Sequence, residues 1–174
     1  MSATTGASCR WPGGADMADA RIIRAGAGEV AAAGGIPWRF KAAAGIGDAF
    51  DFMVGEVPYL SGPPLHVHHE QADTFYVLAG VLTVQVEDEL VELGAGDFAS
   101  VPPGVRHTFD NVLADQPPVK TINLMVPGGL DGFFGDLGAL GDEPAEADLG
   151  RVGEDNGVAF VGPPLRVKLG LAER

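Results

Sequence analysis

The sequence has a single cysteine, Cys9, among its 174 residues. One cysteine forms neither a disulfide framework within the chain nor a cysteine cluster around a metal ion, and it favours a reducing, intracellular setting. The sequence also lacks a run of about 18 apolar residues that would suggest a membrane span, and a basic segment followed by an apolar run that would suggest a signal peptide. We therefore expect a cytoplasmic protein.

Basic residues are few, with 11 Lys and Arg against 24 Asp and Glu, for a net charge of −13. Nucleic acids and anionic membranes are bound by clustered Lys and Arg, so neither is an expected partner. The expected ligands are therefore small molecules or other proteins.

Glycine and proline are abundant, with 26 and 13 residues, more than a fifth of the chain. So many breaks argue against a helical bundle and favour short strands joined by turns. The length and the 46% hydrophobic content suit one domain with one core. We expect a disordered leader over residues 1–19 and a single domain over residues 20–174.

Short apolar or alternating runs recur along the chain and predict strands. These runs are Trp38–Ala42, Ala49–Val57, Thr74–Leu78, Leu82–Val86, Leu90–Leu93, Phe98–Val101 and Lys120–Val126. An acidic turn at Glu87–Glu89 predicts a hairpin between two of them. Strands spaced at roughly ten residues indicate an all-β barrel or sandwich.

The character of the sequence changes after Val126. Leu130–Leu140 carries apolar residues at helical spacing, and Pro144–Glu154 has a proline in its first turn and Asn-Gly after its end. We expect two short helices there, followed by an apolar tail over Val158–Val161.

All four histidines, His66, His68, His69 and His107, fall in two short segments. Successive side chains of a strand point to opposite faces, so His66 and His68 share one face, as two ligands of one ion must. Neutral imidazole is a common ligand of Zn, Fe, Ni and Cu. Taken alone, however, the pair is more typical of a polar strand face or of chance.

The histidines belong to two spaced sets of residues. The first set is Gly62, His66, His68, Asp73 and Gly80, and the second is Gly96, Pro102, Gly104, His107 and Asn111. At these positions the sequence resembles the two motifs of the cupin family. The resemblance implies a jelly-roll barrel, or double-stranded β-helix, in which His66, His68, His107 and a carboxylate surround one metal ion.

The two motifs are matched unequally. The second matches at every fixed position, whereas Gly62 stands two residues nearer to His66 than in the usual first motif. We expect His107 to face His66 and His68 across the interior. Asn111 is interpreted as a turn or backbone-binding residue, and His69 as a surface residue or one behind the ligands.

The family's fourth ligand is a Glu, and this chain has Asp73 at that position. The missing methylene shortens the reach of the carboxylate by roughly 1.5 Å, whereas metal–ligand distances tolerate about 0.2 Å. Three arrangements follow: three histidines plus a carboxylate after a small local shift, three histidines alone, or loss of tight metal binding. Glu70 has the same strand parity as the histidines and is an alternative ligand, or simply a loop charge. Beside a metal, Asp73 is also a candidate general base.

A narrower resemblance covers roughly residues 35–165. Pro63–His69, Thr74–Gly80 and Pro127–Phe134 look like the corresponding runs of single-domain cupins related to quercetin 2,3-dioxygenase. That resemblance implies O2-dependent ring cleavage of a flavonol-like or other enol-bearing aromatic substrate. It also implies one divalent transition metal ion (Fe, Mn, Ni, Co, Cu or Zn) and a homodimer.

Strand parity predicts which apolar residues surround the site. Parity with Asp73 places Phe75 and Val77 inward, and parity with His107 places Phe109 inward. The predicted apolar pocket is completed by Phe52, Val54 and Met125. All six residues would also suit an ordinary barrel core.

Two residues near the motifs carry weaker expectations. Tyr59 either caps the mouth of the pocket or is a surface aromatic. Arg106 should point away from His107, because neighbouring side chains alternate, and form a surface ion pair.

The fold does not determine the reaction. One alternative is a non-catalytic cupin that binds a small molecule and holds a weak or structural metal, and Asp73 favours it. Another is a sugar isomerase or epimerase, which would need polar groups for the sugar hydroxyls and is less consistent with the apolar interior.

Overall fold

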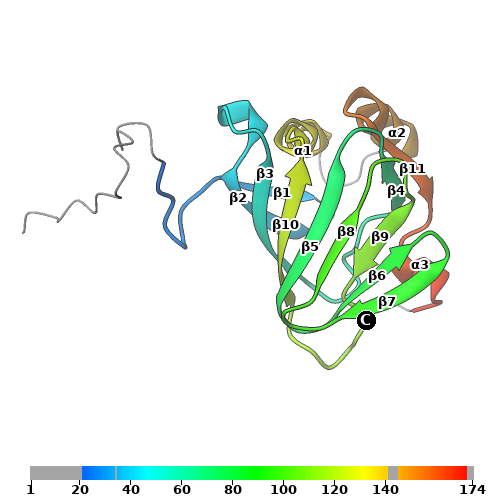
Figure 1. Cartoon of the computed structure of the whole chain (residues 1–174). Helices are drawn as coiled ribbons and strands as arrows, with labels where there is room; N and C mark the ends of the chain where they lie inside the picture. The colour runs from blue at the N-terminus through cyan, green and yellow to red at the C-terminus, as the bar shows by residue number, and fades with distance from the viewer. Residues whose placement is uncertain (1–20, 34, 141–144, 172–174) are drawn as a thin grey trace, which may run out of the picture.

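The computed structural model describes residues 21–33, 35–140 and 145–171. The predicted leader with Cys9 lies outside the described residues. The described strands form two antiparallel sheets that face each other across the core (Figure 1). This is the predicted all-β jelly-roll barrel with short C-terminal helices.

The larger sheet has six strands in the order β1-β2-β3-β10-β5-β8. Their bounds are β1 Val30–Ala33, β2 Ile36–Ala42, β3 Asp51–Val57, β10 Val119–Val126, β5 Ala72–Ala79 and β8 Phe98–Val101. The smaller sheet has five strands in the order β11-β4-β9-β6-β7. Their bounds are β11 Val158–Gly162, β4 Leu65–His68, β9 His107–Asp110, β6 Leu82–Val86 and β7 Glu89–Leu93.

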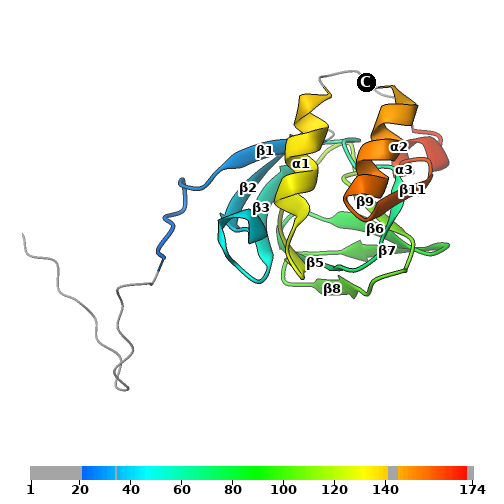
Figure 2. The same cartoon turned by 90° about the horizontal axis from the view of Figure 1, so that it is seen from above.

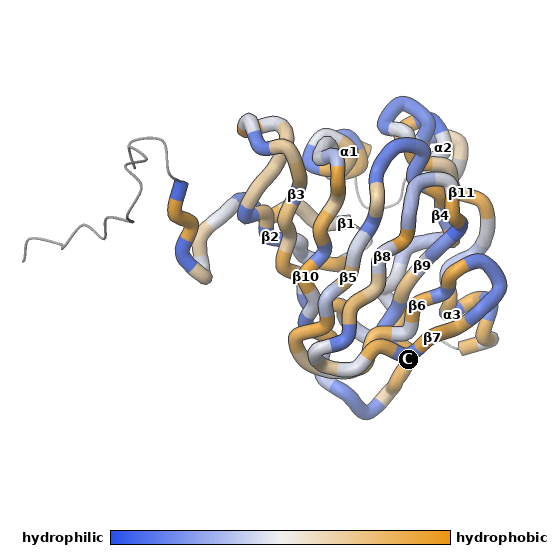
Figure 3. The backbone as a smooth tube through the Cα atoms, in the orientation of Figure 1, coloured by the Kyte–Doolittle hydropathy of each residue, from blue (hydrophilic) through white to orange (hydrophobic). Residues whose placement is uncertain are grey.

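The strand predictions hold to within a few residues, and β6 and β8 have the predicted bounds. The hairpin is also confirmed: Val86 pairs with Glu89, so Glu87 and Asp88 make the turn. Figure 3 shows this turn as a hydrophilic segment. Strand β1 was not predicted, because its sequence is mostly alanine, which has low strand propensity. The expected apolar tail over Val158–Val161 is in fact strand β11.

Helices α1 and α2 lie together at one end of the barrel, and α3 lies apart from them beside the smaller sheet (Figure 1 and Figure 2). Their bounds are α1 Leu130–Ala139, α2 Glu146–Asp155 and α3 Leu165–Lys168, and a short 3-10 turn, η2, lies at Ala44–Ile46. Aromatic contacts join α1 to both sheets: the rings of Phe134 and Phe40 are 5.7 Å apart, and those of Phe133 and Phe160 are 6.4 Å apart. The first two helices confirm the predicted pair, although Pro144 lies outside the described residues. No helix in the described ranges has the length and apolar character that a membrane crossing requires.

The core lies between the sheets and contains most of the apolar residues that strand parity placed inward. Phe75, Val77 and Met125 are fully buried, and Phe109 is 6% exposed. They pack with Ile36, Trp38, Phe40, Met53, Val57, Leu82, Val84 and Val119. The predicted inward orientation of these four residues is therefore confirmed.

Two residues of β3 contradict the prediction. Asp51, Met53 and Val57 are buried, whereas the intervening Phe52 and Val54 are only half-buried and face outward. The prediction that Phe52 and Val54 line the interior is therefore wrong.

The reason is the inward position of Asp51, an acidic residue that would normally be assigned to the surface. Its carboxyl oxygens accept hydrogen bonds from the backbone N–H groups of Gly129 (2.8 Å) and Leu130 (2.6 Å) at the start of α1. They accept a third, at 2.8 Å, from the N–H of Ala44. A buried carboxyl group with three donors is stable, and strand alternation then places Phe52 on the outer face.

We predict that Asp51→Asn lowers the free energy of unfolding by about 2 kcal/mol, because an amide nitrogen would replace an acceptor that faces buried N–H groups. Asp131→Asn is the matched control, since Asp131 accepts one exposed N–H, that of Gly45. Urea unfolding of both variants measures the difference. Equal stability of the two variants would contradict this account of β3.

Candidate metal centre

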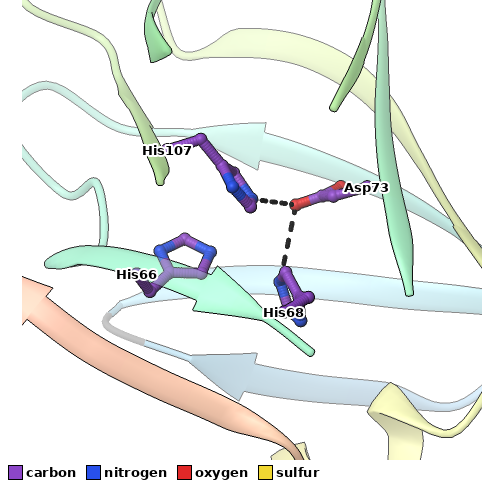
Figure 4. Close-up of side chains that lie close together, drawn as sticks. All are labelled: His66, His68, Asp73 and His107. Atoms are coloured by element: carbon purple, nitrogen blue, oxygen red, sulfur yellow. Dashed lines mark hydrogen bonds and ion pairs between the residues drawn. The ribbon is translucent and has the colours of Figure 1, made fainter. Parts of the chain in front are cut away.

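Four buried side chains converge inside the barrel (Figure 4). His66 and His68 come from β4 and His107 from the adjacent β9, whereas Asp73 comes from β5 in the facing sheet. Each residue offers one potential ligand atom, and these atoms lie within 4.8 Å of one another. The exposed fractions are 6% for His66, 3% for His68 and Asp73, and 1% for His107. The predicted convergence of the three histidines is confirmed.

The histidine strands approach each other because Gly62 lets the chain pass close to β9. A Cβ atom at Gly62 would lie 1.9 Å from the carbonyl oxygen of Phe109, which no side chain can tolerate. The N–H of Gly62 instead donates to Oδ1 of Asp110 at 2.8 Å. His66 then pairs directly with His107 across the two strands.

Backbone carbonyls determine which nitrogen of two imidazoles faces the cluster. Nδ1 of His66 lies 2.8 Å from the carbonyl oxygen of Pro64, and Nδ1 of His107 lies 2.9 Å from that of Val105. A carbonyl oxygen only accepts hydrogen bonds, so both Nδ1 atoms carry a proton. The Nε2 atoms are thereby left for the interior, an arrangement typical of metal-binding histidines.

Burial keeps two of the histidines neutral. It lowers the pKa of His66 to about 3, with the charges of His107 and His68 acting in the same direction. It lowers the pKa of His68 to about 4, against the opposing effect of the Asp73 carboxylate. Both imidazoles therefore offer a lone pair at neutral pH, which metal coordination requires.

Asp73 and His107 shift each other's pKa in the direction opposite to the effect of burial. Burial alone would raise the pKa of the Asp73 carboxyl, but the hydrogen bond from His107 and the nearby histidine charges outweigh it and lower this pKa. Burial alone would likewise lower the pKa of His107, but the hydrogen bond and charge of Asp73 raise it. Each member of this pair thus favours the charged form of the other.

The short side chain of Asp73 does reach the histidines. Its Oδ2 atom lies 3.1 Å from Nε2 of His107 and 3.7 Å from Nε2 of His68. Two ligand atoms each about 2.1 Å from an ion are about 3.0 Å apart in an octahedral site and about 3.4 Å apart in a tetrahedral one. The 3.1 Å spacing fits a metal site, whereas the 3.7 Å spacing exceeds both values, so Asp73 would need the small local shift of the first expected arrangement. Glu70 is exposed and lies outside the cluster.

Asn123 on β10 is a residue of the site that the motifs did not reveal. Its Nδ2 atom donates to Oδ1 of Asp73 and, at 3.1 Å, to the carbonyl oxygen of Thr74. The available signal was its position two residues before Met125, which strand alternation places on the same inward face.

The remaining predicted residues lie as follows. His69 is exposed, and Arg106 forms a 2.7 Å ion pair with Glu87, so both expectations of a surface position are confirmed. The buried Asn111 amide donates to two backbone carbonyls, as expected of a backbone-binding residue. Tyr59 pairs with Asn111, beyond the end of β9 opposite His107, which does not favour a cap over the metal site.

Four of the six predicted pocket residues lie on the inner face with the site. Met125 is paired with Asp73 across β10 and β5. Phe75 follows Asp73 by two residues, and its ring is 4.9 Å from that of Phe109. A role for these residues in substrate contact stays a prediction.

Comparisons with known proteins agree with the cupin resemblance. Residues 54–125 match the cupin domain family. Two quercetin 2,3-dioxygenases are similar in sequence: that of Bacillus subtilis is 33% identical over 73 residues, which cover 42% of this chain and 21% of the relative. That of Aspergillus japonicus is 32% identical over 99 residues, which cover 53% of this chain and 27% of the relative.

A probable oxidoreductase of Hypocrea virens is 36% identical over 76 residues, which cover 43% of this chain. The chain thus spans only 21% to 35% of the length of these relatives.

Solved structures support the fold. KdgF from Halomonas sp. superposes with a TM-score of 0.56 at 18% identity, covering 64% of this chain and 97% of that chain. A RmlC-like cupin from Shewanella frigidimarina gives a TM-score of 0.54 at 20% identity, covering 64% of this chain and 94% of that chain. At such low identity these likenesses show the jelly-roll fold alone.

We predict that His107→Ala abolishes metal retention, whereas Asp73→Glu keeps or tightens it, because the longer carboxylate reaches the ion without a shift. His69→Ala is the matched control, since this exposed histidine lies outside the cluster. Metal content of protein purified without a chelating tag is the measurement. Unchanged metal content in His107→Ala would show that the site is misassigned, and unchanged affinity in Asp73→Ala would show that the carboxylate is not a ligand.

Proposed function

Because this chain is a cupin that resembles the quercetin 2,3-dioxygenase-like proteins, we propose that it is a metal-dependent dioxygenase-like enzyme. Its substrate class would be a small aromatic or enol of the flavonol type, used together with O2. The observation that carries the proposal is the buried cluster of three histidines and one carboxylate facing an apolar interior. A bound redox metal ion would supply open positions at which O2 and a chelating substrate lie side by side.

The ligand residues have distinct roles in this proposal. His66 and His107 present Nε2 to the ion, since their Nδ1 protons are held by backbone carbonyls. His68 completes the histidine set from the same face of β4. Asp73 supplies an oxygen from the facing sheet.

Asp73 would also act as the general base. Its Oδ2 atom is the carboxylate oxygen that points into the histidine cluster, and it would accept the proton of an enol hydroxyl held at the site.

The apolar walls suit an aromatic substrate. Met125 pairs with Asp73, and Phe75 and Phe109 lie two residues from Asp73 and His107; none of these three side chains binds hydroxyl groups. This composition favours an aromatic or enol substrate over a sugar, which requires several hydrogen-bond partners in its pocket.

A second candidate function is a non-catalytic cupin that binds a small molecule and holds a weak or structural metal. The nearly complete burial of the four ligand residues, none more than 6% exposed, favours it. A catalytic metal ion must be accessible to substrate, whereas a purely structural ion need not be.

Elemental analysis followed by oxygen uptake distinguishes the two functions. We expect about one metal ion per chain in untagged protein, and O2 consumption with flavonols or related enols that His66→Ala abolishes and His69→Ala preserves. Oxygen uptake is recorded after loading with Fe, Mn, Ni, Co or Cu in turn.

Two results would count against the oxygenase. Metal far below one ion per chain, with no recovery after loading, would overturn metal-dependent chemistry altogether. Full metal occupancy with no O2 uptake, together with calorimetric binding of a flavonol, would establish the binding module instead.

The corrected orientation of Phe52 provides a matched pair of pocket variants. Met125→Ala removes an inner side chain beside Asp73, and we predict that KM for a flavonol rises about tenfold or more, as for other lost apolar contacts. Phe52→Ala removes an outward side chain of β3 and should leave KM unchanged. Steady-state oxygen uptake measures both, and an equal effect of the two variants would contradict the assigned pocket.

The expectations of a homodimer, of a cytoplasmic location and of a single domain over residues 20–174 stay predictions. The identity of the metal also stays open, because three histidines and one carboxylate suit several divalent ions.

A further inference from the structure

The side chain of Asn123 has no role in the motifs and yet contacts the centre of the site. It is 4% exposed and lies on β10, beside β5 in the six-stranded sheet. Its Nδ2 atom donates to Oδ1 of Asp73 and to the carbonyl oxygen of Thr74.

These two partners determine the orientation of the amide. A carboxylate and a carbonyl oxygen both accept hydrogen bonds, so the NH2 group, which has two protons, must face them. The contact with the backbone of Thr74 anchors Asn123 to the strand that carries Asp73. The second proton is therefore aimed at the carboxylate.

Each oxygen of Asp73 consequently has a different task. Oδ1 is held by Asn123, and Oδ2 is turned toward Nε2 of His107 and of His68. A carboxylate with both oxygens free could rotate and turn Oδ2 away from the histidines. The Asp73 side chain is already one methylene shorter than Glu, so such a rotation would leave it too far from the ion. The hydrogen bond from Asn123 removes that freedom.

We propose that Asn123 is a positioning residue that allows the short Asp73 side chain to serve as the fourth metal ligand, by holding Oδ1 so that Oδ2 faces the histidines. This inference rests on the metal site of the proposed function. It also predicts that a longer carboxylate at position 73 depends less on Asn123.

A double-mutant cycle tests the dependence. Asn123→Leu, which keeps the side-chain volume but donates no hydrogen bond, is made in the Asp73 protein and in Asp73→Glu. Affinity for Co²⁺ is measured by competition with a chelator. We expect a loss of about 10- to 100-fold in the Asp73 protein, as is typical for a residue that orients a ligand, and a clearly smaller loss in Asp73→Glu.

Thr121→Val is the matched control for a purely structural effect. Thr121 is fully buried on the same face of β10, and its hydroxyl donates to the carbonyl oxygen of Tyr76. We expect this variant to lose stability without losing Co²⁺ affinity. The visible absorption of bound Co²⁺, which reports the ligand number and geometry, should change in Asn123→Leu and stay unchanged in Thr121→Val.

Each outcome decides the inference. An equal loss of affinity in both backgrounds, or no loss in either, would overturn it while leaving the metal site intact. If Asn123→Leu does not fold, Asn123→Ser replaces it, since a serine hydroxyl is too short to reach the carboxylate. Failure of the unmutated protein to bind Co²⁺, Fe²⁺, Mn²⁺, Ni²⁺ or Cu²⁺ would instead overturn the proposed function, and this inference with it.

Discussion

The carboxylate of Asp73 joins the histidine cluster of one sheet to the other sheet of the barrel. Three imidazoles project from β4 and β9, and Asp73 faces them from β5. A buried carboxylate is costly unless its oxygens are paired. Here His107 pairs with Oδ2 and Asn123 with Oδ1, so the negative charge is stable inside an otherwise apolar barrel.

The electrostatics of the cluster suit a cation. Burial depresses the pKa of His66 and of His68, so both rings are neutral and present lone pairs to the interior. Nδ1 of His68 has no hydrogen-bond partner among the described residues, although it is buried. Neutral imidazoles and a carboxylate, gathered with few internal donors, are better satisfied by a divalent ion than by one another.

The barrel fold is shared with other proteins, whereas the details of the site have to be taken from this chain. Solved structures of low sequence identity superpose on it, which shows that the two-sheet fold is shared. Asp73, its partner Asn123 and the apolar side chains beside them are observed in this chain itself. Function has to be argued from such features, because one fold supports many chemistries.

Local patterns in the sequence determined the strands, the hairpin and the shared face of His66 and His68, because alternation and turn chemistry act over a few residues. The motif spacing extended this to His107. The orientation of β3 was out of reach, since Asp51 is held inward by donors 78 and 79 residues away. Whether Asp73 reaches the histidines was equally undecided, because reach depends on the separation of two facing sheets and on Asn123, 50 residues further along the chain. Only the tertiary structure brings those groups together.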